Sequence, residues 1–218
     1  MPPKHTISIP QYYRGVFENK IVELYDLAFL IITLGQVKKL RRAIVRAITN
    51  NPKEILDLAT GTGGVAIEIK RRFPNANIVG IDLSNRMLEI AKRKAKRENR
   101  NIKFIQRNIE KTSFQNKFDA VTISFAFHEL PEKNRRNVIK EAYKLLKNNG
   151  IFVLMDYSMS KNLFLKITQS LFINIVEPPY ARTILYEDFE KEFREIGFRK
   201  IKKETMFHEA VQLVKGEK

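Results

Sequence analysis

Residues 57–64 read Asp57-Leu58-Ala59-Thr60-Gly61-Thr62-Gly63-Gly64 and place a glycine-rich turn between a short apolar strand and a helix. Glycine permits the sharp turn and lets a ligand approach the backbone, and the first N–H groups of the helix point toward that ligand. Folds that bind dinucleotides hold a pyrophosphate in this way, and an acid about 20 residues further on binds the ribose hydroxyls. Asp82 is that acid here, because it follows the next predicted strand, 21 residues after Gly61. The turn therefore predicts a nucleoside site.

The charge beside this turn indicates which nucleoside to expect. The spacing departs from G-x-G-x-x-G, because the third small position is Ala66, and Asp57 lies in the strand before the turn. A carboxylate repels a pyrophosphate and attracts an ammonium or a sulfonium group. This favours S-adenosylmethionine over NAD as the ligand. The alternative is a plain strand-to-helix turn whose glycines serve no ligand.

Strand and helix patterns alternate along the middle of the chain. Strands are expected at 54–58, 77–81, 102–106, 118–125 and 151–155, with helices at 65–73, 86–100 and 134–147. Such alternation predicts an α/β fold in which a parallel sheet carries helices on both faces.

The two ends of the chain depart from this alternation. Apolar residues at helical spacing predict helices before Pro52, which cannot continue one. After residue 157, helices are expected at 161–176 and 186–196. Two strands, 198–202 and 205–214, then lie close enough in sequence to pair as an antiparallel hairpin at the edge of the sheet.

Asp57-x-Ala59-x-Gly61-x-Gly63 resembles the first motif of the class I S-adenosylmethionine-dependent methyltransferases. The similarity continues through residues 80–88, 118–125 and 145–150. Val16-Phe17, Tyr25-Asp26 and Lys215-Gly216 are similar to the ubiquinone/menaquinone-biosynthesis C-methyltransferase family. The resemblance implies a Rossmann-like sheet, mostly parallel with a C-terminal antiparallel hairpin. It also implies a single methyltransferase domain over 1–218, made of a helical cap (1–52), a cofactor-binding core (53–157) and acceptor-side helices with the hairpin (158–218).

The resemblance further implies the cofactor contacts. Gly61, Thr62 and Gly63 would line the methionyl part of S-adenosylmethionine, and Asn108-Ile109 would meet the adenine edge. Asp82 would accept both ribose hydroxyls, which its chemistry alone supports, since a carboxylate accepts two O–H bonds at once. The full expected set is Tyr25, Asp57, Ala59, Gly61, Thr62, Gly63, Asp82, Leu83, Met87, Asn108, Ile109 and Ser124.

Methyl transfer from a sulfonium is an in-line displacement that needs no covalent enzyme intermediate, so the protein chiefly positions the two reactants and excludes water. It leaves S-adenosylhomocysteine as the product. His128, just after the fourth predicted strand, is the candidate general base, because imidazole titrates near neutral pH. A histidine that caps the next helix or packs beside Phe127 is the alternative. Glu129 and Asp156 are the other candidate bases.

The expected acceptor is a small hydrophobic molecule, and the resemblance makes a quinol-like ring carbon the leading candidate. Residues 161–176 are apolar around most of the helix, which predicts a wall of the acceptor pocket. Core packing and a dimer face are the alternatives. Tyr12, Tyr13, Phe17 and Tyr25 are expected either to close over the cofactor and acceptor or to pack the N-terminal segment onto the domain.

The composition of the 218 residues limits the chemistry further. The absence of cysteine excludes disulfides, thiolate metal sites and methylation through a cysteine adduct. His5, His128 and His208 lack metal-ligand spacing, so no metal is expected. No apolar run approaches the roughly 20 residues of a membrane span, and no signal-peptide pattern is visible, so a cytoplasmic enzyme is expected.

The net charge of +16, from 40 basic and 24 acidic residues, is the least specific feature. Basic runs at 38–46 and 86–117 are interpreted as solvated faces away from the cofactor loop, with an anionic membrane surface or RNA as alternatives. No RNA-binding module is visible, so a small-molecule substrate is favoured over nucleic acid, and a homodimer stays open. An RNA or protein methyltransferase is the enzymatic alternative, and a nucleoside-binding module without turnover is the non-enzymatic one.

Overall fold

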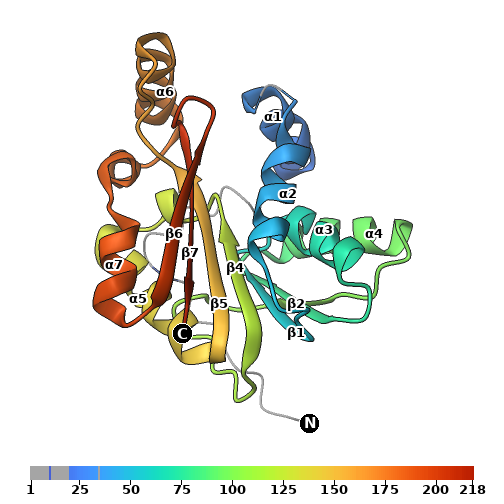
Figure 1. The fold of residues 1–218 in the computed structure, drawn as a ribbon. Helices are drawn as coiled ribbons and strands as arrows, with labels where there is room; N and C mark the ends of the chain where they lie inside the picture. The colour runs from blue at the N-terminus through green and yellow to red at the C-terminus, as the bar shows by residue number, and fades with distance from the viewer. Residues whose placement is uncertain (1–9, 11–19, 34) are drawn as a thin grey trace.

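The computed structural model describes Pro10 and residues 20–33 and 35–218 (Figure 1). Within these residues the chain forms one seven-stranded sheet in the order β3-β2-β1-β4-β5-β7-β6. The strands are β1 Glu54–Leu58, β2 Asn77–Asp82, β3 Lys103–Gln106, β4 Phe118–Ser124, β5 Leu146–Tyr157, β6 Arg199–Met206 and β7 Val211–Glu217. Strands β1 to β5 pair in parallel, whereas β7 is antiparallel to both β5 and β6. The predicted parallel sheet with a C-terminal antiparallel hairpin is confirmed.

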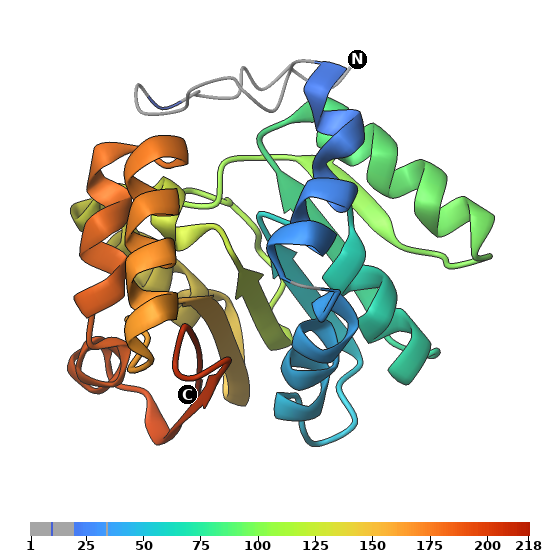
Figure 2. The ribbon, with the colours of Figure 1, turned by 90° about the horizontal axis from the view of Figure 1, so that it is seen from above.

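Helices cover both faces of this sheet (Figures 1 and 2). The α-helices are α1 Tyr25–Ile32, α2 Val37–Ala47, α3 Gly64–Arg72, α4 Asn85–Arg97, α5 Glu132–Leu145, α6 Leu163–Val176 and α7 Phe189–Ile196. The short 3-10 helices are η2 Lys20–Leu24, η3 Phe127–Glu129 and η4 Pro179–Tyr186. None of the helices in the described part of the chain is both long and apolar enough to cross a membrane.

Side chains that alternate along the strands belong to two hydrophobic clusters, one on each face of the sheet. Ile55 of β1 packs on one face with the apolar sides of α2, α3 and α4. Leu56, the next residue, packs on the other face with α5, η4 and α7. Both residues are fully buried, as a two-sided parallel sheet requires. The sheet thereby holds the carboxyl ends of β1, β2, β4 and β5 at one edge, where the loops that follow them meet.

Two predicted boundaries are wrong, namely the start of β5 and the position of the turn between β6 and β7. The fifth strand, expected at 151–155, begins at Leu146 directly after α5, so Asn149 and Gly150 lie inside β5. Asn149 has a positive φ of 62° where the register between β4 and β5 shifts, so the pair makes a β-irregularity. The hairpin turn falls at residues 207–210 rather than near 203–204. Phe207, His208 and Glu209 all adopt positive φ values there, and none of them is a usual turn residue.

The predicted helix at 186–196 is also shorter than expected. Helix α7 begins after Asp188, whose side chain caps it by accepting from the Lys191 N–H, and the preceding residues form the 3-10 helix η4. Tyr12, Tyr13 and Phe17, expected to cover the site, lie outside the described residues.

Arg135 of α5 joins the segments that follow β4 and α6. Its side chain is completely buried, and every part of the guanidinium group donates a hydrogen bond. Its partners are the carbonyls of Phe127, Leu130 and Tyr180, the Thr183 hydroxyl and the Glu187 carboxylate. This one cation therefore links η3 and η4 to α5.

Replacing Arg135 by alanine is expected to lower the free energy of unfolding by about 3–5 kcal/mol, because Glu187 and three carbonyls lose their buried partner. Chemical denaturation monitored by circular dichroism measures this change. Arg136→Ala is the matched control, since Arg136 forms ion pairs at the surface with Glu192 and Glu195 and its loss is expected to change stability little. Equal effects of the two substitutions would contradict the assigned role of Arg135.

Candidate functional site

A cleft lies at the carboxyl ends of β1, β2 and β4, where the glycine-rich turn enters α3. It encloses about 1080 Å³, including the open solvent at its mouth. Nine of the twelve residues predicted to bind the cofactor line it: Tyr25, Ala59, Gly61, Thr62, Asp82, Leu83, Met87, Ile109 and Ser124. The structure thus brings together residues from five separate segments of the sequence at one edge of the sheet.

The turn has the backbone conformation that its glycines predict. Gly61 has a φ of 54°, and a Cβ atom added there would meet nothing within 4 Å, so the turn faces open space at this residue. Gly63 has a φ of 77°, but an added Cβ would lie 2.9 Å from the Cβ of Ala91. Gly63 therefore permits α4 to pack closely against the turn, and it does not line the cleft.

Asp57 supports the turn from behind. Its carboxylate is almost completely buried and accepts hydrogen bonds from the hydroxyls of Thr60 and Thr122, each at 2.6 Å. Burial raises the pKa of Asp57 to about 6, against the lowering effect of these two hydrogen bonds. Asp57 was predicted to contact the cofactor, but it does not line the cleft, because the residues of the turn lie in front of it.

Asp82 lines the cleft with its carboxylate held in a fixed orientation. One oxygen accepts from the N–H of Gly61 at 2.8 Å, and the other accepts from the N–H of Ser84 at 2.9 Å. Two backbone amides, one for each oxygen, therefore set the orientation of this carboxylate.

The pair Asn108-Ile109 is divided between the cleft and the loop. Ile109 lines the cleft, whereas Asn108 does not. The Asn108 side-chain oxygen accepts from the N–H of Glu110 at 2.8 Å, which makes a local turn after β3. Only Ile109 is thus placed to meet the face or edge of a bound ring.

A group of charged side chains attaches α1 to the turn. Asp26 of α1 accepts from the Thr62 hydroxyl at 2.9 Å and pairs with Lys94 of α4 at 2.9 Å. Lys94 also donates to Thr62, and Arg41 of α2 lies 3.6 Å from Asp26. The prediction that the basic runs form solvated faces away from the cofactor loop is therefore wrong for Arg41 and Lys94. Burial lowers the pKa of Lys94, but Asp26 acts against this effect.

Four aromatic rings form a continuous row from α1 to the end of β5. Tyr25 stacks on Phe29, Phe29 meets the edge of Phe125 at 5.1 Å, and Phe125 meets Tyr157 at 5.6 Å between ring centres. Phe125 directly follows β4 and has a φ of 49°, a strained value for a phenylalanine. Burial and the nearby Asp82 raise the pKa of Tyr25, so its phenol is protonated at neutral pH.

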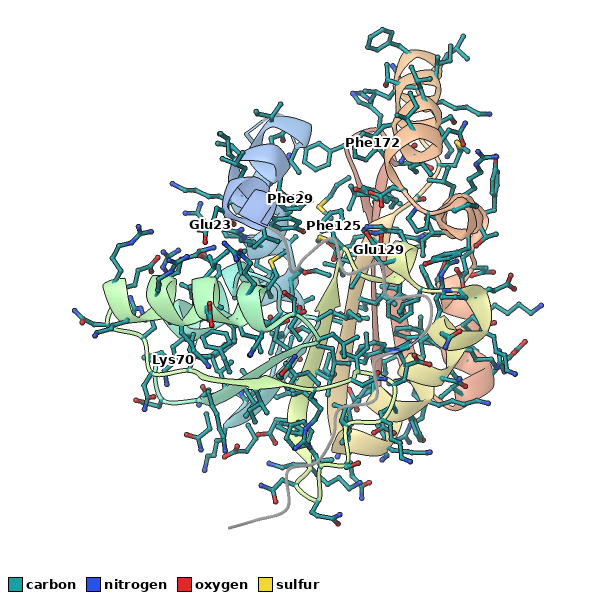
Figure 3. All side chains as sticks on the ribbon, turned by 180° about the vertical axis from the view of Figure 1, so that it is seen from behind. Glu23, Phe29, Lys70, Phe125, Glu129 and Phe172 are labelled. Carbon is teal, nitrogen blue, oxygen red and sulfur yellow. The ribbon has the colours of Figure 1, made fainter. Side chains whose placement is uncertain are left out.

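Beyond this row lies a second and larger cavity of about 1920 Å³, again including open solvent. Phe29 and Phe125 line both cavities, so they form the wall between them. The other sides come from α2, α6 and the turn of the β6–β7 hairpin. Figure 3 shows Phe29 on α1 and Phe172 on α6 facing each other across the gap between the two helices, with Phe125 and Glu129 beneath them.

His128 lies next to the cleft but does not line it. It is buried, and its Nδ1 lies 2.8 Å from Asp156, whose carboxylate also accepts from the N–H groups of Ala126, Phe127 and Tyr157. Burial would lower the pKa of His128, but the charges of Asp156 and Glu177 raise it to about 9. An imidazole that is protonated at neutral pH cannot accept a proton, so the geometry gives no support to His128 as the base.

Among the described residues, His128, Glu129 and Glu177 hold their ligating atoms within 4.8 Å of one another, close enough to bind one metal ion. The protonated imidazole already supplies a positive charge among these acids, with its Nε2 3.8 Å from Glu177. The expectation that the protein uses no metal stays a prediction.

Sequence reasoning missed six residues of the cleft wall, namely Phe29, Arg41, Thr60, Gly64, Val65 and Leu130. Phe125, Ala126 and Glu129 also line the cleft, and they were expected in the crevice because they follow a strand at its carboxyl end. Arg41 carried no usable signal, since a basic residue on an amphipathic helix is usually solvated. It faces the turn because only glycine at position 64 leaves room for the guanidinium group, which would lie 2.4 Å from an added Cβ.

The raised pKa of His128 predicts how stability depends on pH. The protonated form stabilises the fold fully below the unfolded pKa of 6.5, and this contribution is lost as the pH rises through about 9. Between pH 6 and 9.5 the free energy of unfolding is expected to fall by about 3 kcal/mol relative to His128→Gln, from 1.36 kcal/mol per pKa unit. Chemical denaturation at both pH values measures the difference.

His208→Gln is the control for this experiment, because His208 is exposed in the hairpin turn. Its pH profile is expected to match that of the unchanged protein. If His128→Gln had that same profile, the assigned charge on His128 would be wrong.

Comparisons with known proteins agree with this geometry. Residues 55–150 match a family described as a methyltransferase domain. Over 140 residues the chain is 38% identical to the demethylmenaquinone methyltransferase of Thermotoga maritima, a match that covers 63% of this chain and 58% of that protein. Over 155 residues it is 32% identical to the ubiquinone/menaquinone biosynthesis C-methyltransferase of Rickettsia typhi, covering 68% and 62%. The matched stretches thus span about three fifths of these relatives.

A solved structure extends the likeness to nearly the whole chain. Human N-acetylserotonin methyltransferase, in complex with S-adenosylmethionine, aligns with a TM-score of 0.71 at 16% identity and covers 96% of this chain and 60% of that one. This likeness establishes the fold, which is that of the class I S-adenosylmethionine-dependent methyltransferases. Within it, residues 55–150 match a methyltransferase domain.

Proposed function

We propose that the protein transfers a methyl group from S-adenosylmethionine to a small apolar acceptor, with a ring carbon of a quinol as the leading candidate. The observation that carries this proposal is the pair of adjoining cavities that share Phe29 and Phe125 as a wall. In-line transfer needs the acceptor atom in contact with the methyl group, so the two reactants would have to meet at this shared boundary. The names of the relatives, which include demethylmenaquinone methyltransferase, support the choice of acceptor.

The residues of the first cavity fit S-adenosylmethionine. Asp82, oriented by two amides, would accept the ribose hydroxyls, and Ile109 and Leu83 would pack against the adenine. Gly61 leaves space for the methionyl part beside the turn. The bound cofactor supplies an electrophilic methyl group on a sulfonium, and aromatic faces such as those of Tyr25 and Phe29 attract cationic centres.

The second cavity fits an apolar acceptor. Its walls carry five phenylalanines and several aliphatic side chains, while its polar groups include Lys39, Gln169 and His208. Gln169 is itself held by the carbonyls of Ser158 and Ala210, to which its amide donates. A ring with a hydrocarbon substituent would bury apolar surface here at about 25 cal/mol for each Å².

The residues at the shared wall position the reactants and exclude water. Phe29 and Phe125 stand where the two cavities meet, and Ser124 and Glu129 line the cofactor side of this boundary. Glu129 is the carboxylate on this wall, so it is the candidate to take the proton that the acceptor ring loses after methylation. Asp156 is unsuited to that role, because its oxygens already accept four hydrogen bonds.

Asp82→Ala is expected to weaken the binding of S-adenosylhomocysteine by about 10- to 100-fold, which corresponds to about 1–3 kcal/mol for lost charged hydrogen bonds. Isothermal titration calorimetry measures the affinity. Glu89→Ala is the control, because Glu89 is an exposed acid on α4, the helix that follows Asp82. An unchanged affinity in Asp82→Ala would remove Asp82 from the site, and tight NAD binding with no response to S-adenosylmethionine would overturn the proposed cofactor.

Phe172→Asp is expected to reduce methyl transfer to a short-chain quinol at least about tenfold, because burying a charge in an apolar wall is costly. The affinity for S-adenosylhomocysteine should stay within about twofold, since Phe172 does not line the first cavity. Asn174→Asp adds the same charge on the exposed side of α6 and serves as the control. Transfer of radiolabelled methyl groups measures the rates.

Equal rates for the two variants would argue against the second cavity as the acceptor site. Labelling of bulk RNA or protein, with none of the quinol, would replace the proposed acceptor by a macromolecule.

A further inference from the structure

Exposed apolar side chains are concentrated on two helices. In the described part of the chain, ten large apolar residues are exposed, and nine of them lie on α6 or on the continuous stretch of η2 and α1. These nine are Leu24, Leu27, Leu30, Ile31, Leu163, Phe164, Ile167, Leu171 and Ile175. The tenth is Tyr186. Scattered apolar residues are ordinary on a protein surface, whereas a concentration of this kind marks an interaction site.

The two helices lie at the same end of the molecule. Both α1 and α6 extend beyond the carboxyl ends of the strands, with the tip of the β6–β7 hairpin between them (Figure 1). Their facing sides line the second cavity through Phe29, Phe164 and Phe172. The exposed apolar residues therefore surround the mouth of that cavity, and the name "rim surface" is used below for these nine residues.

The charge around the rim surface is mainly positive. Residues 27–53 hold six basic residues and no acidic one, and residues 157–176 hold Lys161 and Lys166 and no acidic one. Lys38 and Lys39 are exposed at the start of α2, directly after α1. The acids nearest in sequence are paired, since Glu209 contacts Lys161 at 2.7 Å and Asp26 contacts Lys94. Glu23 of η2 contacts Arg93 at 3.0 Å.

We propose that the rim surface docks on the surface of an anionic phospholipid bilayer. Apolar side chains flanked by lysines suit the boundary between acyl chains and anionic headgroups, where apolar burial and charge attraction add. Helix α6 has 14 residues, about 21 Å at 1.5 Å per residue, which is short of a hydrocarbon core about 30 Å thick. The helices therefore lie in the interface, and the mouth of the second cavity opens toward the lipid.

Sedimentation with lipid vesicles tests this proposal without S-adenosylmethionine or an acceptor, so its outcome is independent of the proposed reaction. The full chain is expected to sediment with vesicles containing phosphatidylglycerol and to bind pure phosphatidylcholine at least about tenfold more weakly. Raising the salt concentration should release it, because salt screens the attraction between lysines and headgroups.

Two double variants separate the apolar and charged contributions. Ile167→Ser with Leu171→Ser removes exposed apolar residues of α6 that do not line the cavity. Lys38→Glu with Lys166→Glu reverses two charges beside the rim surface. Each is expected to weaken vesicle binding about tenfold or more, since one lysine near an anionic surface contributes about a factor of five.

The controls make equivalent changes elsewhere on the surface. Tyr186→Ser removes the exposed apolar residue that lies off the rim surface. Lys140→Glu with Lys144→Glu reverses two exposed charges on α5, near its end at the opposite edge of the sheet. Both controls should bind vesicles within about twofold of the unchanged protein.

Three outcomes would overturn the proposal. The first is equal binding to both kinds of vesicle, and the second is equal binding by the variants and their controls. The third has two parts. Analytical ultracentrifugation shows a stable dimer that dissociates in the double variant Ile167→Ser with Leu171→Ser, and no variant changes vesicle binding. That result would assign the rim surface to a second copy of the chain.

Discussion

A buried carboxylate holds the glycine turn in position. Asp57 lies in β1 almost without solvent contact, where an ionised group is stable only if its oxygens are hydrogen-bonded. Thr60 from the turn and Thr122 from β4 provide these bonds, so the side chain ties two neighbouring strands to the loop between β1 and α3. Asp82 then takes its orientation from the Gly61 amide of that same turn. The positions of the glycine turn and of Asp82 in the cleft follow from this sequence of contacts.

The sequence predicted the parts of the structure that depend on local pattern. The alternation of strands and helices, the turn at residues 57–64 and the position of Asp82 all follow from spacing within a few tens of residues, and the structure agrees. The hairpin turn at Phe207, His208 and Glu209 was misplaced, because residues that rarely take positive φ do so here. The pairing of β5, β6 and β7 imposes that conformation from outside the turn.

Long-range charge placement could not be predicted from the sequence. Arg41 and Lys94 lie on helices whose patterns indicate solvated basic faces, yet both turn toward Asp26 beside the cleft. Likewise, nothing near His128 in the sequence indicates that Asp156 and Glu177 surround it and raise its pKa to about 9. The net charge of +16 is therefore divided between a few residues that build the site and many that face solvent. Only the tertiary structure assigns each residue to one group or the other.

Phe29 has a consequence for the affinities of the two cavities for their ligands. It stands on α1, which Asp26 attaches to Thr62 in the turn, and its ring forms part of both cavities. A ligand that shifts this ring in one cavity changes the shape of the other, so the two binding free energies are coupled. Such coupling is reciprocal, because each ligand must change the affinity for the other by the same factor. A ligand in either cavity that moves the aromatic wall would therefore make binding in the two compartments cooperative.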